Sequence, residues 1–350
     1  MVQWVRWGLI MAGGLALFPL MILDMMIGAY GVSPIVVLKA VIDAVDPIFN
    51  VPHDTYLVVW QIRLPETLAS LILGASLASA GSVLQGILRN PLASTYTLGV
   101  SAAAGFGAAV AILLGAGYVI KYYLPVITRP YLVIIAAFIA SSLAALLVYF
   151  LSFIKGASPI TIILAGVAVM FIFSTGTSLI QYFSGNPDVS HAIAMWMLGS
   201  VSNVTLNYIP YMALSLLAIP YYVLISWRLN ALNLGDDVAH SLGVNVRSTR
   251  LTVMLVAAFQ AAATVSFVGL VGFVDLVIPN IVRAIIGNDN RYLIPASTLM
   301  GADVTVLADV VSKALVPPYV IPIGVVLSMI GAPYLLAIII SRGTQYGYGQ

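Results

Sequence analysis

The chain has 350 residues, of which 61% are hydrophobic and only 7% are charged, and its formal net charge is +2. A soluble domain carries about 25% charged residues, so this chain cannot cover a water-facing surface. Its mean hydropathy of +1.07 indicates an integral membrane protein. The absence of cysteine excludes disulfides and thiolate metal sites, and the small net charge gives no indication of a nucleic-acid partner.

Apolar runs long enough to cross a hydrocarbon core of about 30 Å recur along the whole chain. We therefore predict an all-α membrane protein with one polytopic transmembrane domain over residues 1–350. About ten spans are expected, at residues 7–31, 60–85, 93–115, 131–152, 159–184, 206–227, 248–268, 270–286, 293–314 and 321–341. We interpret the first as an uncleaved span rather than a signal peptide, because further apolar segments follow it. The eighth is short and contains Pro279, which predicts an interruption.

An even number of spans places both termini on the same side of the membrane. With both termini in the cytoplasm, nine of the 14 lysines and arginines fall in inner loops, in agreement with the positive-inside rule. The expected location is therefore the cell membrane, with the lipid bilayer as the main environment of the chain.

The second span carries small residues at four-residue spacing, Gly74, Ala78 and Ser82, which predicts close packing against another helix. A stripe of Ser76, Ser79, Ser82 and Gln85 occurs on the same helix, and it could line a path. In the fifth span, Ser174, Thr177, Ser178 and Gln181 share one helical face. They are candidate pathway-lining residues. The alternative is that their hydroxyls bond back to their own helix or join neighbouring helices.

Charged residues inside spans are expensive and usually functional. Asp24, Asp275 and Asp303 are such residues, and Asp309 lies four positions before Lys313, a spacing that favours an ion pair within one helix. Coupling-ion sites of secondary transporters use intramembrane carboxylates beside broken helices. An ion-coupled secondary transporter that depends on Asp275 or Asp303 therefore remains an alternative function.

The chain lacks the residues that catalysis would need. A phosphate-binding loop of an ATPase ends in Gly-Lys, and none of the lysines in this chain follows a glycine. The three histidines fall in separate loops and cannot share a metal ion. No catalytic residues, metal site or bound cofactor are predicted, and the chain is not expected to be an enzyme.

Two segments carry a recognisable pattern. The first, from Arg63 to Gly105, reads RLPETLASLILGASLASAGSVLQGILRNPLASTYTLGVSAAAG, and the second, from Asn233 to Arg342, includes LGVNVRSTR, SFVGLVGFVDLVIPNIVR and IPIGVVLSMIGAPYLL. Together they resemble the permeases of type II ABC importers, the family of the cobalamin, iron-siderophore, haem and metal-chelate permeases. The resemblance implies ten spans and a homodimer with a second copy of this chain around a shared pathway. It also implies two ABC ATPase subunits that hold ATP and Mg, and an extracytoplasmic substrate-binding protein.

The resemblance also assigns residues to roles. It implies an ATPase-coupling loop that contains Asp236, Asp237, Ala239, Leu242, Gly243 and Val244. The two aspartates are expected to cap a short helix, Ala239 and Leu242 to give it an apolar face, and Gly243 to end it. At the inner mouth, Leu92, Ser158 and Pro159 match a cytoplasmic gate, where an apolar constriction can exclude water.

On the outer side, Arg63 and Lys313 match basic positions that receive acidic residues of the binding protein, and such charges steer docking. Glu66 departs from the family pattern, which often has a second basic residue there. Residues 280–291 match a signature at the cytoplasmic end, with an expected ATPase contact. The implied cargo is an iron siderophore or a related metal chelate or cobalamin; haem and a molybdate or tungstate oxyanion are alternatives.

Overall fold

The computed structural model describes residues 2–28, 30–43, 48–116 and 129–342, and the described part is all-α. The helices in chain order are α1 (Val2–Met26), α2 (Pro34–Asp43), α3 (His53–Leu57), η1 (Val58–Arg63), α4 (Leu64–Leu88), α5 (Val100–Ala116), α7 (Arg129–Ile154), α8 (Pro159–Phe183), α9 (Pro187–Met197), η3 (Leu206–Tyr208), α10 (Ile209–Ala213), η4 (Leu214–Leu217), α11 (Ala218–Leu224), α12 (Ser226–Asn233), α13 (Asp236–Ser241), α14 (Val246–Val268), α15 (Val274–Ile286), α16 (Asn290–Ala314) and α17 (Ile323–Arg342).

Each predicted span coincides with a helix or a run of helices. Within the described residues, six helices are long and apolar enough to cross a membrane, or seven if the bent pair 206–224 and 226–233 is one span. The helices α5 and α17 are shorter apolar helices. The predicted eighth span, α15, is short, but Pro279 lies inside it without ending it. A proline has no N–H for the carbonyl four residues earlier, and here the Gln85 side chain donates to that carbonyl, on Asp275, at 3.4 Å.

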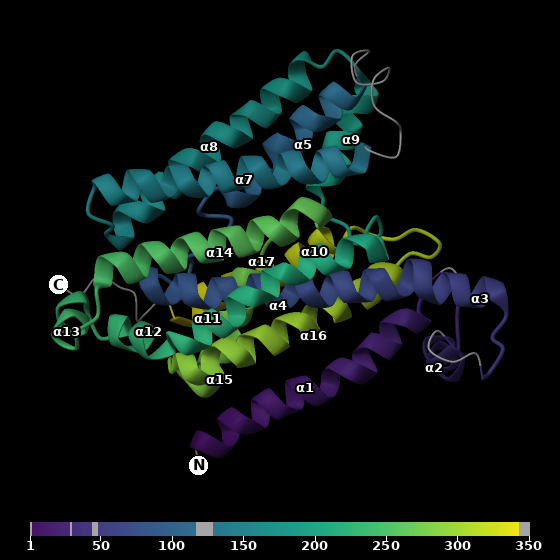
Figure 1. Cartoon of the computed structure of the whole chain (residues 1–350), viewed down its shortest axis with the longest axis horizontal. Coiled ribbons are helices and arrows are strands. Elements are labelled where there is room, and N and C mark those ends of the chain that lie inside the picture. Colours follow the sequence, from purple (N-terminus) through teal and green to yellow (C-terminus); the bar gives the residue numbers. More distant parts are fainter. Residues whose placement is uncertain (1, 29, 44–47, 117–128, 343–350) are drawn as a thin grey trace.

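The centre of the bundle is α4, which is almost wholly buried (Figure 1). The predicted small-residue packing is confirmed, because a Cβ atom on Gly74 would lie 2.1 Å from the carbonyl oxygen of Gly301 in α16. The serine stripe is buried as well. Ser76 is 2.7 Å from the Ser215 hydroxyl, and Ser79 accepts from Gln260 at 3.0 Å. These serines therefore join helices of one chain and do not line an open path.

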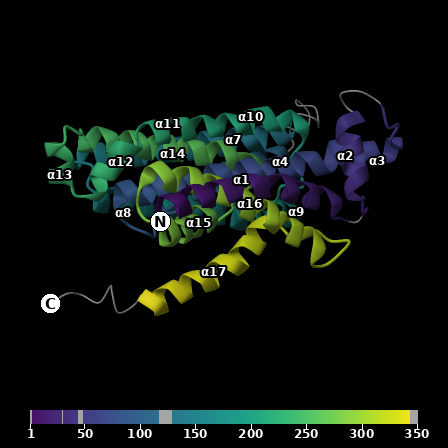
Figure 2. The same ribbon diagram turned by 90° about the horizontal axis from the view of Figure 1, so that it is seen from below.

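The bundle has two distinct ends. The start of α1 and the end of α17 lie toward the same end as α12 and α13, and α2 and α3 form the opposite end (Figures 1 and 2). Figure 2 also shows α17 leaning away from the other helices, on the face opposite α10 and α11.

Candidate functional site

The short helix α13 projects from one end of the bundle (Figure 1). Gly235, with φ of +127°, and Gly243, with φ of +81°, set its two ends, since L-residues rarely adopt these angles. The predicted apolar face is divided: Ala239 packs inward and is buried, whereas Leu242 is 57% exposed. Leu234 and Val238 are exposed beside it, and Val244 is buried. The result is an apolar ridge, formed by Leu234, Val238 and Leu242, on the outer side of α13.

A buried arginine fixes α13 to the bundle. Arg250 is 2% exposed, and its guanidinium donates to both carboxylate oxygens of Asp236, at 2.8 and 3.2 Å. Arg89 also pairs with Asp236. The hydrogen bond from Arg250 and the charges of both arginines hold the pKa of Asp236 below its usual value. Asp236 thus anchors the helix from its first turn.

The capping role predicted for the two aspartates is wrong. The residue before α13 is Gly235, and no side chain caps the helix. Asp236 is turned toward the arginines, and Asp237 is exposed. The cause is the position of Arg250, which lies on the next helix, α14, and supplies a stronger, charge-assisted partner.

The same arginine connects the two segments of the predicted gate. Its Nε donates to the carbonyl of Ile87 at 2.9 Å, and its Nη1 donates to the carbonyl of Ala157 at 3.1 Å. Ile87 precedes the loop that carries Leu92, and Ala157 precedes Ser158 and Pro159. The structure therefore brings both segments to the base of α13.

The predicted gate residues differ in their exposure and in their structural role. Leu92 is 51% exposed, on a turn where its N–H donates to the Asn90 side chain at 2.9 Å. Ser158 caps α8 by accepting from the N–H of Thr161 at 3.1 Å, and Pro159 is the first residue of that helix. The Leu92 side chain is thus exposed on a turn, whereas Ser158 and Pro159 hold the start of a helix.

The signature at residues 280–291 mainly joins helices. The Asn230 side chain donates to Asp289 at 2.8 Å and accepts from Asn290 at 2.8 Å, which ties α12 to the start of α16. Hydrogen bonds from Arg291, followed by those from Asn230, lower the pKa of Asp289 to about 2. Asn290 is fully buried, so the expected ATPase contact is not available to it.

A second region lies deeper in the bundle. A cavity of about 720 Å³ lies between the turn after Leu92, the end of α9, the segment before α15 and the start of α17. Its lining residues include Ser94, Tyr96, Thr97, Met197, Phe273, Asp275, Ser328 and Met329. The walls are mostly apolar, and among the described residues that line them Asp275 is the one carboxylate.

Asp275 is a structural residue in this arrangement. Its carboxylate accepts from the N–H and from the hydroxyl of Thr95, both at 2.7 Å. It therefore holds the turn at residues 94–97 against the start of α15. Sequence reasoning singled out Asp275 but missed Tyr96 and Phe273, because loops that meet only in the tertiary structure leave no periodic signal.

The predicted pathway-lining residues of α8 do not line this cavity. Thr177 is buried and donates to the carbonyl of Phe173 at 3.0 Å, and Ser178 is exposed and donates to that of Ser174 at 3.1 Å. Gln181 is half-buried. The bonding within one helix is the alternative that the sequence left open, and the lining role of these residues stays a prediction.

The predicted docking charges are buried rather than displayed. Lys313 donates to Asp24 at 3.1 Å and lies 3.1 Å from Glu66 and 2.7 Å from Asp309, which confirms the expected Asp309–Lys313 pair. Arg63 lies 3.8 Å from Glu66. Both basic side chains are thus neutralised among α1, α4 and α16. The expectation of two exposed docking charges is corrected, since acidic groups of the same chain already occupy them.

Asp303 has a different environment. It is half-buried against Gly13 of α1, and its Oδ1 atom has no hydrogen-bond partner among the described residues.

Comparison with known proteins gives one consistent result. Residues 15–341 match the model of the FecCD transport family. A protein of Methanocaldococcus jannaschii, named as an ABC transporter permease, is 41% identical over 289 residues, 82% of each chain. The hemin transport system permease of Yersinia pestis is 32% identical, over 84% of this chain and 86% of its own. A solved structure, described as an inward-facing conformation of a metal-chelate type ABC transporter, matches with a TM-score of 0.81 and 29% identity, over 95% of this chain and 98% of that one.

Proposed function

The chain belongs to the FecCD transport family, and from this premise we propose which cargo it carries and how it is driven. It is a permease subunit of a type II ABC importer and a multi-pass protein of the cell membrane. The proposed cargo is an iron siderophore or a related metal chelate or cobalamin. The proposed machine contains two copies of this chain, each a single domain over residues 1–350, two ABC ATPases that hold ATP and Mg, and an external binding protein.

The apolar ridge on α13 is the observation that carries this proposal. Exposed leucines at the end of a membrane bundle are costly in water, and Leu242 stands on a helix that Arg250 holds rigidly to the gate segments. A rigid apolar projection of this kind fits a cleft on a partner. Movement of that partner would then reach Leu92 and Ser158 through the carbonyls bound by Arg250.

The proposed pathway suits a cargo that is bound weakly. The cavity beside Tyr96 and Phe273 has mainly apolar walls, and the carboxylate of Asp275 is occupied by Thr95. Conduction requires that a site release what it binds. Relatives are named for hemin, cobalamin and Fe(3+)-citrate, which supports a metal chelate. Haem or a molybdate or tungstate oxyanion, moved in the same way, remain the alternative cargoes.

The proposed transport function also assigns roles to the gate and pathway residues. We place the cytoplasmic gate at Leu92, with Ser158 and Pro159 as its fixed side, and the outer wall of the pathway on α8 at Ser174, Thr177, Ser178 and Gln181. The binding protein would dock at the end formed by α2 and α3, opposite α13.

The substitution Leu242→Glu tests the coupling role. A carboxylate forced into an apolar cleft should weaken docking by about 3 kcal/mol, or roughly 100-fold, so the ATPase should no longer co-purify with the permease. The matched control is His191→Glu, which adds the same charge on exposed α9. Undiminished recovery of the ATPase with Leu242→Glu would remove α13 from the interface.

One observation favours a second function. Asp303 lies in a membrane span, and one of its carboxylate oxygens has no hydrogen-bond partner in the part of the chain that the structure describes; ion-coupled secondary transporters use groups of this kind. That function predicts transport without any ATPase and its loss in Asp303→Asn.

A further inference from the structure

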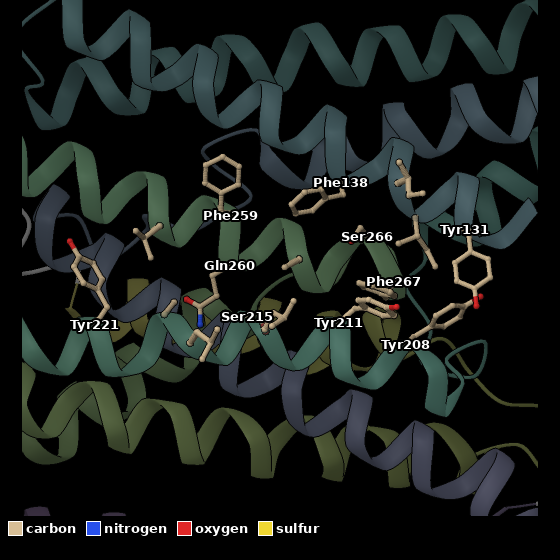
Figure 3. A pocket seen from close by; sticks show the side chains of 17 residues that line it. Tyr131, Phe138, Tyr208, Tyr211, Ser215, Tyr221, Phe259, Gln260, Ser266 and Phe267 are labelled. Carbon is tan, nitrogen blue, oxygen red and sulfur yellow. The ribbon is translucent and has the colours of Figure 1, made fainter. Parts of the chain in front are cut away.

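A groove opens between α7, α14 and the irregular span 206–224, and Figure 3 shows the side chains that line it. Its volume is about 800 Å³, within the range of roughly 300–1,000 Å³ that small-molecule sites occupy. The walls are almost entirely aromatic and aliphatic. The aromatic side chains among them are Tyr131, Phe138, Tyr208, Tyr211, Tyr221, Phe259 and Phe267.

The irregular span explains why this space stays open. Pro210 stands at the start of α10, where a helix tolerates proline, and Pro220 lies inside the span, where its missing N–H leaves a gap in the helical hydrogen bonds. Between them, Leu214–Leu217 is a 3₁₀ segment, and the span bends by 61° where α12 follows it. A span built in this way cannot pack along the straight helix α7 over its whole length.

The groove lies on the side of the bundle away from the candidate pathway, and its apolar walls suit contact with hydrocarbon. Its walls include α10 and α11, which lie on the face opposite α17 (Figure 2), and the start of α17 lines the cavity beside Phe273. From Tyr208 to Tyr221 the span rises by about 20 Å at 1.5 Å per residue. One leaflet contributes about 15 Å, half of the hydrocarbon core, so the groove is long enough to hold an acyl chain over the full depth of one leaflet.

The two ends of the groove differ. Figure 3 shows Tyr131, Tyr208 and Tyr211 together at one end and Tyr221 alone at the other. The three tyrosines lie toward the end of the bundle opposite α13, and the rings of Tyr131 and Tyr208 meet edge to face at 5.2 Å. Tyrosine hydroxyls gather at the level of lipid head groups, which marks this end as the membrane interface.

Two polar side chains on the floor of the groove are already hydrogen-bonded within the protein, so they need no water. Gln260 accepts from Tyr222 at 2.8 Å and donates to Ser79 at 3.0 Å, and Ser215 is bonded to Ser76. Water needs two to four polar partners to stay in a cavity. The exception is Ser266, whose buried hydroxyl has no partner in the described part of the chain and lies on the tyrosine side of the groove (Figure 3).

We propose that this groove binds one acyl chain of a phospholipid from the leaflet opposite α13, with the ester region at the three tyrosines and the methyl end near Phe259. The lipid would occupy the space that the irregular span leaves beside α7. This site is independent of the cargo and of the ATPase.

Photo-crosslinking tests the site directly. The purified chain is exchanged into phosphatidylglycerol that carries a diazirine in its acyl chain, washed with excess detergent to remove loosely held lipid, irradiated and mapped by peptide mass spectrometry. Adducts should be retained on the walls of the groove. The variant Ala263→Trp, which fills the groove, should lower them at least five-fold, and Ile172→Trp, on the exposed face of α8, should leave them unchanged.

Three outcomes of the crosslinking experiment would overturn the proposal. The first is that no lipid is retained after washing. The second is that the adducts are spread evenly over the exposed face of α8. The third is that Ala263→Trp retains as much crosslinked lipid as the wild type. If that variant does not fold, the wild-type adduct map decides alone. A second copy of the chain is the other possible occupant. Because the chain has no cysteine, disulfide formation between copies of Phe138→Cys in membranes would reveal it and would refute the lipid site.

Discussion

The substitution Arg250→Met should release α13 from the bundle. It removes a guanidinium that makes hydrogen bonds to Asp236, Ile87 and Ala157. Removal of one partner of a buried ion pair costs about 3–5 kcal/mol. The Asp236 side chain is partly exposed and keeps Arg89, so a value near 3 kcal/mol is the better estimate, which corresponds to roughly a 100-fold rise in the population with α13 undocked.

Amide hydrogen exchange measures that population. Peptides covering residues 234–244 should exchange up to about 100-fold faster in Arg250→Met, because local opening sets the exchange rate, and the interior of α4 should stay protected. The matched control is Arg247→Met on the same helix, where the arginine is exposed, donates to the carbonyl of Phe153 and lies over the ring of that residue. Equal exchange in wild type and Arg250→Met would refute the idea that Arg250 anchors α13.

Three further predictions concern stability. The pKa of Asp289 is about 2 in the folded chain, below its unfolded value of about 3.9. The contribution of Asp289 to the free energy of unfolding is therefore present above pH 4 and is lost as the pH falls toward 2. The melting temperature of Asp289→Asn should accordingly depend less on pH in that range than the melting temperature of the wild type. Gly74→Ala should cost about 1–3 kcal/mol by forcing α4 from α16, and thermal unfolding should show no loss in Gly8→Ala, where space is free. Lys313→Met leaves three buried carboxylates without their cation and should cost about 3–5 kcal/mol, whereas Lys155→Met, on an exposed side chain, should unfold like the wild type.

Local pattern predicted most of the fold. Apolar length predicted where the helices lie, and four-residue spacing predicted the contact at Gly74, because both signals are carried by neighbouring residues. The same holds for the pair of Asp309 and Lys313, which are one helical turn apart.

The errors arise where partners come from distant segments. From the sequence alone, Lys313 is interpreted as an exposed docking charge. The structure shows that Asp24 and Glu66, which lie on two other helices, pair with it. Asp236 reads as a helix cap until Arg250 is placed beside it. The cavity near Tyr96 also depends on loops that meet only after folding, and a single sequence does not contain that information.

Uptake into proteoliposomes tests the central claim most directly. This chain is reconstituted with its ATPase, a loaded binding protein and a radiolabelled iron chelate. We predict uptake that requires ATP and the ATPase, falls sharply in Leu242→Glu and is unaffected by Asp303→Asn. Uptake that proceeds without the ATPase, follows an imposed ion gradient and is lost in Asp303→Asn would contradict the account.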